Sequence, residues 1–81
     1  MKKEEIIKII KKIIEKENIS FDFNSKNLDL TLKQVGIDSL QVMSIVVAIE
    51  EELNVTIPDD QLTKIKNLNN LIDIFYLLTN K

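Results

Sequence analysis

Residues that break helices are almost absent from this chain of 81 residues, which has one glycine, Gly36, and one proline, Pro58. Most other positions hold residues that helices tolerate well, and 44% of the chain is hydrophobic. This composition favours an all-α fold. A chain of this size buries only about 60 to 65% of its unfolded surface. We therefore expect a single domain over residues 1–81, with a small core and no deep catalytic cavity.

Apolar residues recur at helical spacing in three long segments and one short segment. The isoleucines of the first segment follow the pattern i, i+3, i+4, i+7, which marks one face of a helix. They are Ile6, Ile9, Ile10 and Ile13. The short segment follows Pro58, and Asn67 is a suitable N-cap for the last helix. The predicted helices span residues 3–17, 39–53, 59–64 and 68–79.

Residues 18–37 have a different pattern, in which apolar and polar residues alternate. The apolar positions are Ile19, Phe21, Phe23, Leu28, Leu30 and Leu32, on either side of the sequence NSKN. Alternation is typical of strands, so the period alone favours a β-hairpin. The alternative is a long loop that packs its apolar side chains against the helices. Loops of this length are uncommon in small domains unless they are functional or packed.

Histidine and cysteine are both absent from the sequence. The chain therefore lacks the commonest general base, the imidazole and thiolate ligands of most zinc sites, and any disulfide bond. Carboxylates, hydroxyls and lysines are the reactive groups that remain. On this inventory we expect neither an enzyme nor a metal site.

No targeting or membrane segment is expected. The longest uninterrupted apolar runs, residues 45–49 and 74–78, fall far short of the roughly 20 residues of a membrane span. The basic N-terminal start is reminiscent of a signal peptide, but Lys8, Lys11 and Lys12 interrupt the apolar run and no small-residue cleavage site follows. We therefore expect a cytoplasmic protein, which the lack of cysteine also fits.

Acidic residues are concentrated in the middle of the sequence. Residues 38–62 hold six acidic side chains and no basic one, whereas residues 1–37 hold eight lysines against six acids. An acidic segment repels nucleic-acid phosphates and attracts basic protein surfaces, mainly by raising the rate of encounter. A basic protein partner is therefore favoured over nucleic acid. The alternative is a solvated helix end that keeps a small protein in solution.

The polar residues at the start of the predicted helix 39–53 have separable roles. If Asp38 is the N-cap, Gln41 occupies the third helical position and the two approximate a capping box. Gly36 lets the chain turn sharply before the helix. Ser39 then has no role in the cap, and it lies beside free backbone N–H groups at the positive end of the helix dipole, where a phosphate is held favourably. A serine at this position is also common in helices without a site.

The same segment has more apolar surface than one core face requires. The stripe expected to face the core consists of Val42, Ile45, Val46, Ile49 and Leu53. A second stripe begins beside Ser39 and consists of Leu40, Met43 and Val47. Such a helix is either surrounded on all sides or keeps a patch for a partner, and in a domain this small we favour the partner. Met43 suits a surface that must fit several partners.

The segment VGIDSLQVMSIVVAIEEELNVTIPDD closely resembles the signature of acyl carrier proteins. It combines a Gly-x-Asp-Ser-Leu turn, an apolar helix that ends in Glu-Glu-x-Leu, and an Ile-Pro-Asp, all at the family's spacing. The resemblance extends over about residues 28–76. It implies a small antiparallel bundle of three long helices and one short helix. Residues 18–37 are then a long packed loop between the first two helices, and we prefer this interpretation to the hairpin.

The resemblance also implies a non-catalytic carrier. In this family a phosphopantetheinyl transferase attaches a phosphopantetheine arm from coenzyme A to the serine of the motif, here Ser39, and the thiol of the arm carries acyl groups as thioesters. Asp38 would orient the turn and be recognised by the transferase. The other partners implied are acyl-loading and acyl-processing enzymes with basic docking surfaces, which would bind a monomer. The partner-binding residues implied are Leu40, Met43, Val47, Glu50, Glu51 and Glu52.

Two positions depart from the carriers of bacterial fatty acid synthesis, which often have acids where this chain has Gln41 and Ser44. Fatty acid or related biosynthesis is the first expectation for the pathway. The departure leaves open a specialised carrier of aminoacyl, peptidyl or polyketide groups. A helical adaptor that docks by the same helix and carries no cofactor is a second alternative. The low content of Pro and Gly favours a freestanding carrier.

Overall fold

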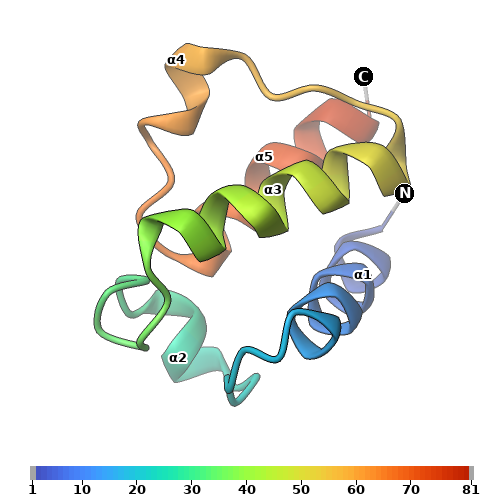
Figure 1. The fold of residues 1–81 in the computed structure, drawn as a ribbon. Helices are drawn as coiled ribbons and strands as arrows, with labels where there is room; N and C mark the ends of the chain where they lie inside the picture. The colour runs from blue at the N-terminus through green and yellow to red at the C-terminus, as the bar shows by residue number, and fades with distance from the viewer. Residues whose placement is uncertain (1, 81) are drawn as a thin grey trace.

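The computed structural model describes residues 2–80, which form five helices and no strand. The helices are α1 (Lys3–Lys16), α2 (Ser25–Asp29), α3 (Ser39–Leu53), α4 (Asp59–Leu62) and α5 (Leu68–Thr79). Helix α1 contacts both α3 and α5, and it runs in the opposite direction to them (Figure 1). The predicted all-α bundle of three long helices is confirmed, with α2 as an additional short helix. None of the helices in this part of the chain is both long and apolar enough to cross a membrane.

The core lies between the three long helices and consists of apolar side chains. Its buried residues are Ile6, Ile10, Ile13, Ile14, Ile19, Leu32, Ile37, Ile45, Val46, Ile49, Ile57, Leu68, Leu71, Ile72 and Phe75. Removing one such side chain from water contributes roughly 1.5 to 3 kcal/mol. Ile9, a predicted core position, is only partly buried, and Ile14 lies on the inner face of α1 instead.

The segment between α1 and α3 is a packed connection and not a β-hairpin. Ile19 is buried, and the half-buried rings of Phe21 and Phe23 pack edge to face with centroids 4.8 Å apart. Aromatic pairs prefer this arrangement. The sequence NSKN, which a hairpin would use as its turn, begins α2, because the side chain of Asn24 accepts a hydrogen bond from the backbone N–H of Asn27 (2.8 Å).

Two residues close the C-terminal end of α3. Asn54 adopts the left-handed conformation (φ 55°) that commonly ends helices. The carboxylate Oε2 of Glu50 accepts a hydrogen bond from the backbone N–H of Ile57 (2.7 Å), and the Ile57 side chain is buried in the core. The chain that leads to α4 is therefore held along α3. Helix α4 ends at Leu62, before the predicted end at residue 64.

Candidate functional site

The start of α3 has the capping geometry that the sequence predicts. Asp38 Oδ1 accepts a hydrogen bond from the backbone N–H of Gln41 (2.8 Å), and Gln41 Oε1 accepts one from the backbone N–H of Asp38 (2.9 Å). The capping box is therefore confirmed. Gly36 precedes it with φ 83°, a left-handed conformation that side chains other than hydrogen disfavour.

Ser39 is the first residue of α3, and it takes no part in this cap. Its side chain is exposed. Within residues 2–80 its hydroxyl has no hydrogen-bond partner. The neighbouring Asp38 and Gln41 bond to each other. Ser39 therefore presents a free nucleophilic oxygen at the positive end of a helix of 15 residues.

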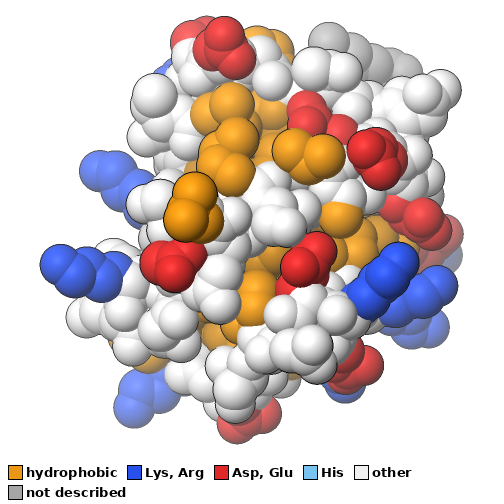
Figure 2. All heavy atoms as spheres, viewed as in Figure 1, with side chains coloured by type: hydrophobic (Ala, Val, Ile, Leu, Met, Phe, Trp, Pro, Cys, Tyr) orange, Lys and Arg blue, Asp and Glu red, His pale blue; other side chains and the backbone are white. Residues whose placement is uncertain are grey.

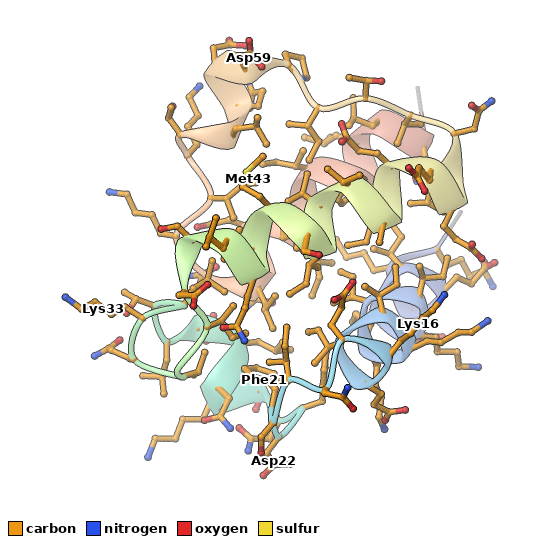
Figure 3. The ribbon with its side chains drawn as sticks, in the orientation of Figure 1. Lys16, Phe21, Asp22, Lys33, Met43 and Asp59 are labelled. Carbon is orange, nitrogen blue, oxygen red and sulfur yellow. The ribbon has the colours of Figure 1, made fainter. Side chains whose placement is uncertain are left out.

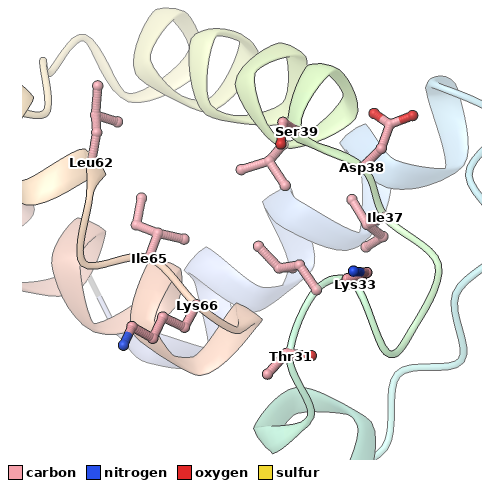
Figure 4. A pocket seen from close by; sticks show the side chains of 10 residues that line it. Thr31, Lys33, Ile37, Asp38, Ser39, Leu62, Ile65 and Lys66 are labelled. Carbon is pink, nitrogen blue, oxygen red and sulfur yellow. The ribbon is translucent and has the colours of Figure 1, made fainter.

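Ser39 lies at the edge of a pocket of about 720 Å³. The pocket is formed by the start of α3, the turn before it and the connection from α4 to α5 (Figure 4). Five apolar side chains line it: Leu32, Ile37, Val42, Leu62 and Ile65. The polar lining residues are Thr31, Lys33, Asp38, Ser39 and Lys66. The sequence did not reveal this pocket, because it brings together residues 31–39 and 62–66.

The predicted second stripe of α3 is exposed. The exposed fraction is 83% for Leu40, 45% for Met43 and 45% for Val47. Figure 2 shows hydrophobic side chains gathered over this side of α3, with acidic side chains at their edge. Figure 3 shows Met43 on the opposite side of α3 from Phe21. We call Leu40, Met43 and Val47 the exposed stripe.

The three glutamates that follow the exposed stripe differ in their exposure and in their contacts. Glu50 is half-buried and holds the backbone of Ile57. Glu51 is exposed and lines a surface hollow together with Glu50 and with Val47 of the exposed stripe. Glu52 lines a crevice with Lys12 and Lys16 of α1. Only Glu51 is therefore both exposed and next to the exposed stripe.

The two positions that depart from fatty acid carriers both have structural contacts. Gln41 completes the capping box through its side chain. The hydroxyl of Ser44 donates a hydrogen bond to Glu17 Oε1 (3.2 Å), which links α3 to the end of α1. A glutamate at position 41 would keep an acceptor for the Asp38 N–H group, whereas an acid at position 44 would lose the bond that Ser44 donates and would face the carboxylate of Glu17.

Known proteins resemble this chain in sequence over most of its length. Residues 4–75 match the family described as the phosphopantetheine attachment site. An acyl carrier protein homolog from Ureaplasma parvum serovar 3 is 43% identical over 67 residues, which cover 83% of this chain and 84% of that protein. The chain belongs to the acyl carrier protein family.

Two further comparisons extend the likeness to the whole fold. An acyl carrier protein homolog from Mycoplasma genitalium is 34% identical over 82 residues, covering 100% of this chain and 98% of that protein. The solution structure of the 5-phenyl-3-oxo-pentyl actinorhodin acyl carrier protein from Streptomyces coelicolor matches with a TM-score of 0.74 and 25% identity. It covers 91% of this chain and 88% of the other. The fold class and the family predicted from the sequence are thus confirmed.

Proteins of this family are non-catalytic carriers with a covalently attached phosphopantetheine group. The predicted cofactor is therefore confirmed at the level of the family. The start of α3 also fits such a group, because the exposed Ser39 hydroxyl, which has no partner among residues 2–80, is next to a pocket lined in part by apolar side chains. As carriers, such proteins interact with partner enzymes.

Proposed function

We propose that residues 1–81 form a single carrier domain that holds acyl groups on a phosphopantetheine arm attached to Ser39. The observation that carries the proposal is the Ser39 hydroxyl, which is exposed and unpaired within the described chain while its neighbours are engaged in the cap. Attachment joins Ser39 Oγ to the phosphorus of the arm, breaks the pyrophosphate bond of coenzyme A and releases adenosine 3′,5′-bisphosphate. When bound, the arm supplies the thiol that forms thioesters.

The chain's own residues have defined tasks in this proposal. Asp38 and Gln41 fix the turn, so that the hydroxyl of Ser39 is presented at a constant angle. Backbone N–H groups at the start of α3 favour the negative charge of the phosphodiester. A phosphopantetheinyl transferase supplies the base that removes the hydroxyl proton, since the chain has no histidine and no cysteine.

The exposed stripe is the proposed docking surface for the transferase and for acyl-loading and acyl-processing enzymes. Its apolar side chains lie beside Ser39 on the same helix, so a bound enzyme reaches the attachment point. Among the predicted acidic contacts, Glu51 is best placed to meet a basic residue of the partner, followed by Glu52. Glu50 contributes mainly through the bond to Ile57.

A specialised pathway is the second candidate, alongside fatty acid or related biosynthesis. It is supported by Gln41 and Ser44, which replace acids at the start of the docking helix with neutral side chains that serve the fold. The Streptomyces coelicolor structure concerns a carrier with a 5-phenyl-3-oxo-pentyl group, so this fold accepts substituents other than simple fatty chains. We further propose a cytoplasmic monomer, in which the exposed stripe stays free for its enzymes.

The test is to incubate the unmodified chain with coenzyme A, magnesium and a broad-specificity phosphopantetheinyl transferase. Intact mass spectrometry should show the gain of one phosphopantetheine, and Ser39→Ala should abolish it. Ser44→Ala is the matched control, because Ser44 is an exposed serine of the same helix, and this variant should be modified normally. No gain of mass on the natural sequence would favour the alternative, a helical adaptor without a cofactor.

A further inference from the structure

The end of α1 brings one carboxylate into contact with α3. Glu17 is the C-cap of α1, and its backbone N–H donates a hydrogen bond to the carbonyl oxygen of Ile13 (2.9 Å). The buried Ile14 and Ile19 enclose it in the sequence, and the N–H of Ile19 bonds to the carbonyl oxygen of Ile14 (3.1 Å). The backbone of Glu17 is therefore held against the core. Its side chain accepts the hydrogen bond of the Ser44 hydroxyl on α3 (3.2 Å).

The stability of α1 does not explain an acid at this position. A carboxylate at the C-terminal end of a helix is unfavourable, because the helix dipole is negative there. Glutamine would accept the same hydrogen bond from Ser44 without this penalty. Within residues 2–80 the carboxylate of Glu17 takes part in no ion pair, so no basic side chain offsets the cost. The side chains of Glu17 and Ser44 are both exposed, so a protein that binds there meets an unpaired negative charge.

Ser44 marks where this charge lies relative to the exposed stripe. It is four positions after Leu40 and three before Val47, and residues at these spacings are neighbours on a helix. Glu51 follows Ser44 by almost two full turns, so both lie on the same side of α3, about 10 Å apart along its axis. The exposed stripe is thus bordered on one side by two carboxylates, that of Glu17 from α1 and that of Glu51 from α3 itself.

We propose that Glu17 is part of the docking surface for the phosphopantetheinyl transferase, although it lies outside α3. The inference rests on the proposed attachment of the arm to Ser39. The transferase then has an apolar patch that covers the exposed stripe and, at its border, two basic side chains about 10 Å apart, one for Glu17 and one for Glu51. Two separated charges fix the register of the enzyme along α3, and therefore its distance from Ser39.

The size of the effect follows from the exposure of Glu17. An exposed ion pair contributes little, so loss of this charge should lower kcat/KM for modification about threefold. The loss should arise mainly in the rate of encounter, because charges at the rim of an interface act there. It should vanish at about 1 M salt, where exposed charges more than about 3 Å apart are screened.

The experiment measures kcat/KM of a broad-specificity transferase at low ionic strength, with coenzyme A and magnesium, by intact mass. Glu17→Gln is the central variant, because glutamine removes the charge and still accepts the bond from Ser44. It should be modified about threefold more slowly than the natural chain. Glu15→Gln is the matched control, and its rate should not change. Glu15 is an exposed acid of the same helix, and its side chain makes no hydrogen bond or ion pair within the described residues.

A second variant separates the charge from the bond between the helices. Glu17→Ala combined with Ser44→Asp has no bond between positions 17 and 44, yet it keeps one carboxylate on this side of the exposed stripe. Its rate should be close to that of the natural chain, whereas Glu17→Ala alone should be modified about threefold more slowly. If the double variant is as slow as Glu17→Ala, the bond and not the charge is what matters, and the inference is wrong. The urea midpoint of each variant shows that the rates compare folded chains.

The outcomes also separate the inference from the function on which it rests. If the natural chain gains no mass, the carrier function fails and the inference fails with it. If the natural chain is modified and Glu17→Gln is modified equally fast, the carrier function stands and only the inference fails. An equal loss in Glu15→Gln would reduce the effect to net charge, and a loss that persists at about 1 M salt would not be electrostatic. Either result would overturn the inference.

Discussion

Replacement of Asp38 by alanine tests whether the residues at the start of α3 have separate roles. The substitution removes the carboxylate that accepts the hydrogen bond of the Gln41 N–H group (2.8 Å). Loss of an N-cap costs about 1 kcal/mol, and loss of a negative charge at a helix N-terminus adds about 0.3 to 1 kcal/mol. Because Asp38 is exposed, we expect the lower part of this range, a total of about 1.3 to 1.5 kcal/mol.

Ser39→Ala is the paired measurement. It removes a hydroxyl that has no partner within the described residues, so the free energy of unfolding should change by less than about 0.5 kcal/mol. Urea unfolding of the unmodified chain, followed by far-UV circular dichroism, measures both variants. In thermal unfolding, a loss of 1 kcal/mol corresponds to about 4 to 8 °C for a domain of this size.

Two results would refute the reasoning. If Ser39→Ala lowers the free energy of unfolding as much as Asp38→Ala does, the hydroxyl of Ser39 belongs to the helix cap and has a structural role. Gln41→Ala is the internal control, because it leaves the bond from the Gln41 N–H group to Asp38 and removes only the reverse bond to the Asp38 N–H group (2.9 Å). It should cost less than Asp38→Ala; a larger cost would assign the main capping role to Gln41.

Three further predictions concern the two ends of α3 and its exposed stripe. Glu50→Ala removes a charged hydrogen-bond acceptor and should lower the free energy of unfolding by about 1.5 to 3 kcal/mol in urea, against less than about 0.5 kcal/mol for Glu51→Ala. Gly36→Ala should cost about 1 to 2 kcal/mol through its φ of 83° alone, since no atom lies within 4 Å of an added Cβ; an unchanged urea midpoint would contradict this. Leu40→Asp should slow modification by the transferase about tenfold with little change in stability, whereas the equally apolar Leu77→Asp on α5, outside the stripe, should leave the rate unaltered.

The long helices could be predicted from the sequence because their periodic apolar residues determine which face is buried. The short helix α2 could not, because five residues give no periodic signal and none of them is fully buried. The alternation of Phe21 and Phe23 suggested a strand. In the structure the two rings pack against each other within a connection that has no regular secondary structure.

The details of the site were predictable only where they are local. The capping box lies within four consecutive residues, so the sequence revealed it. The pocket depends on the backbone bond between Leu32 and Lys66, and backbone bonds leave no trace in side-chain patterns. The sequence predicts that Glu50, Glu51 and Glu52 bind partners together. Successive residues of a helix, however, point about 100° apart. That rotation sends Glu50 to the chain before α4 and Glu52 toward α1.

Helix α3 is fastened at both ends by its own polar bonds, from Asp38 and Gln41 at the start and from Glu50 near the end. Its inner face is held by the core, and the residues of the exposed stripe lie outside that core. Changes at such positions usually alter stability by less than about 0.5 kcal/mol. The residues of the exposed stripe can therefore be substituted with little effect on the stability of the domain. Replacing the residues of the exposed stripe by those of another carrier should therefore transfer that carrier's preference for partner enzymes. No compensating change elsewhere in the domain should be needed.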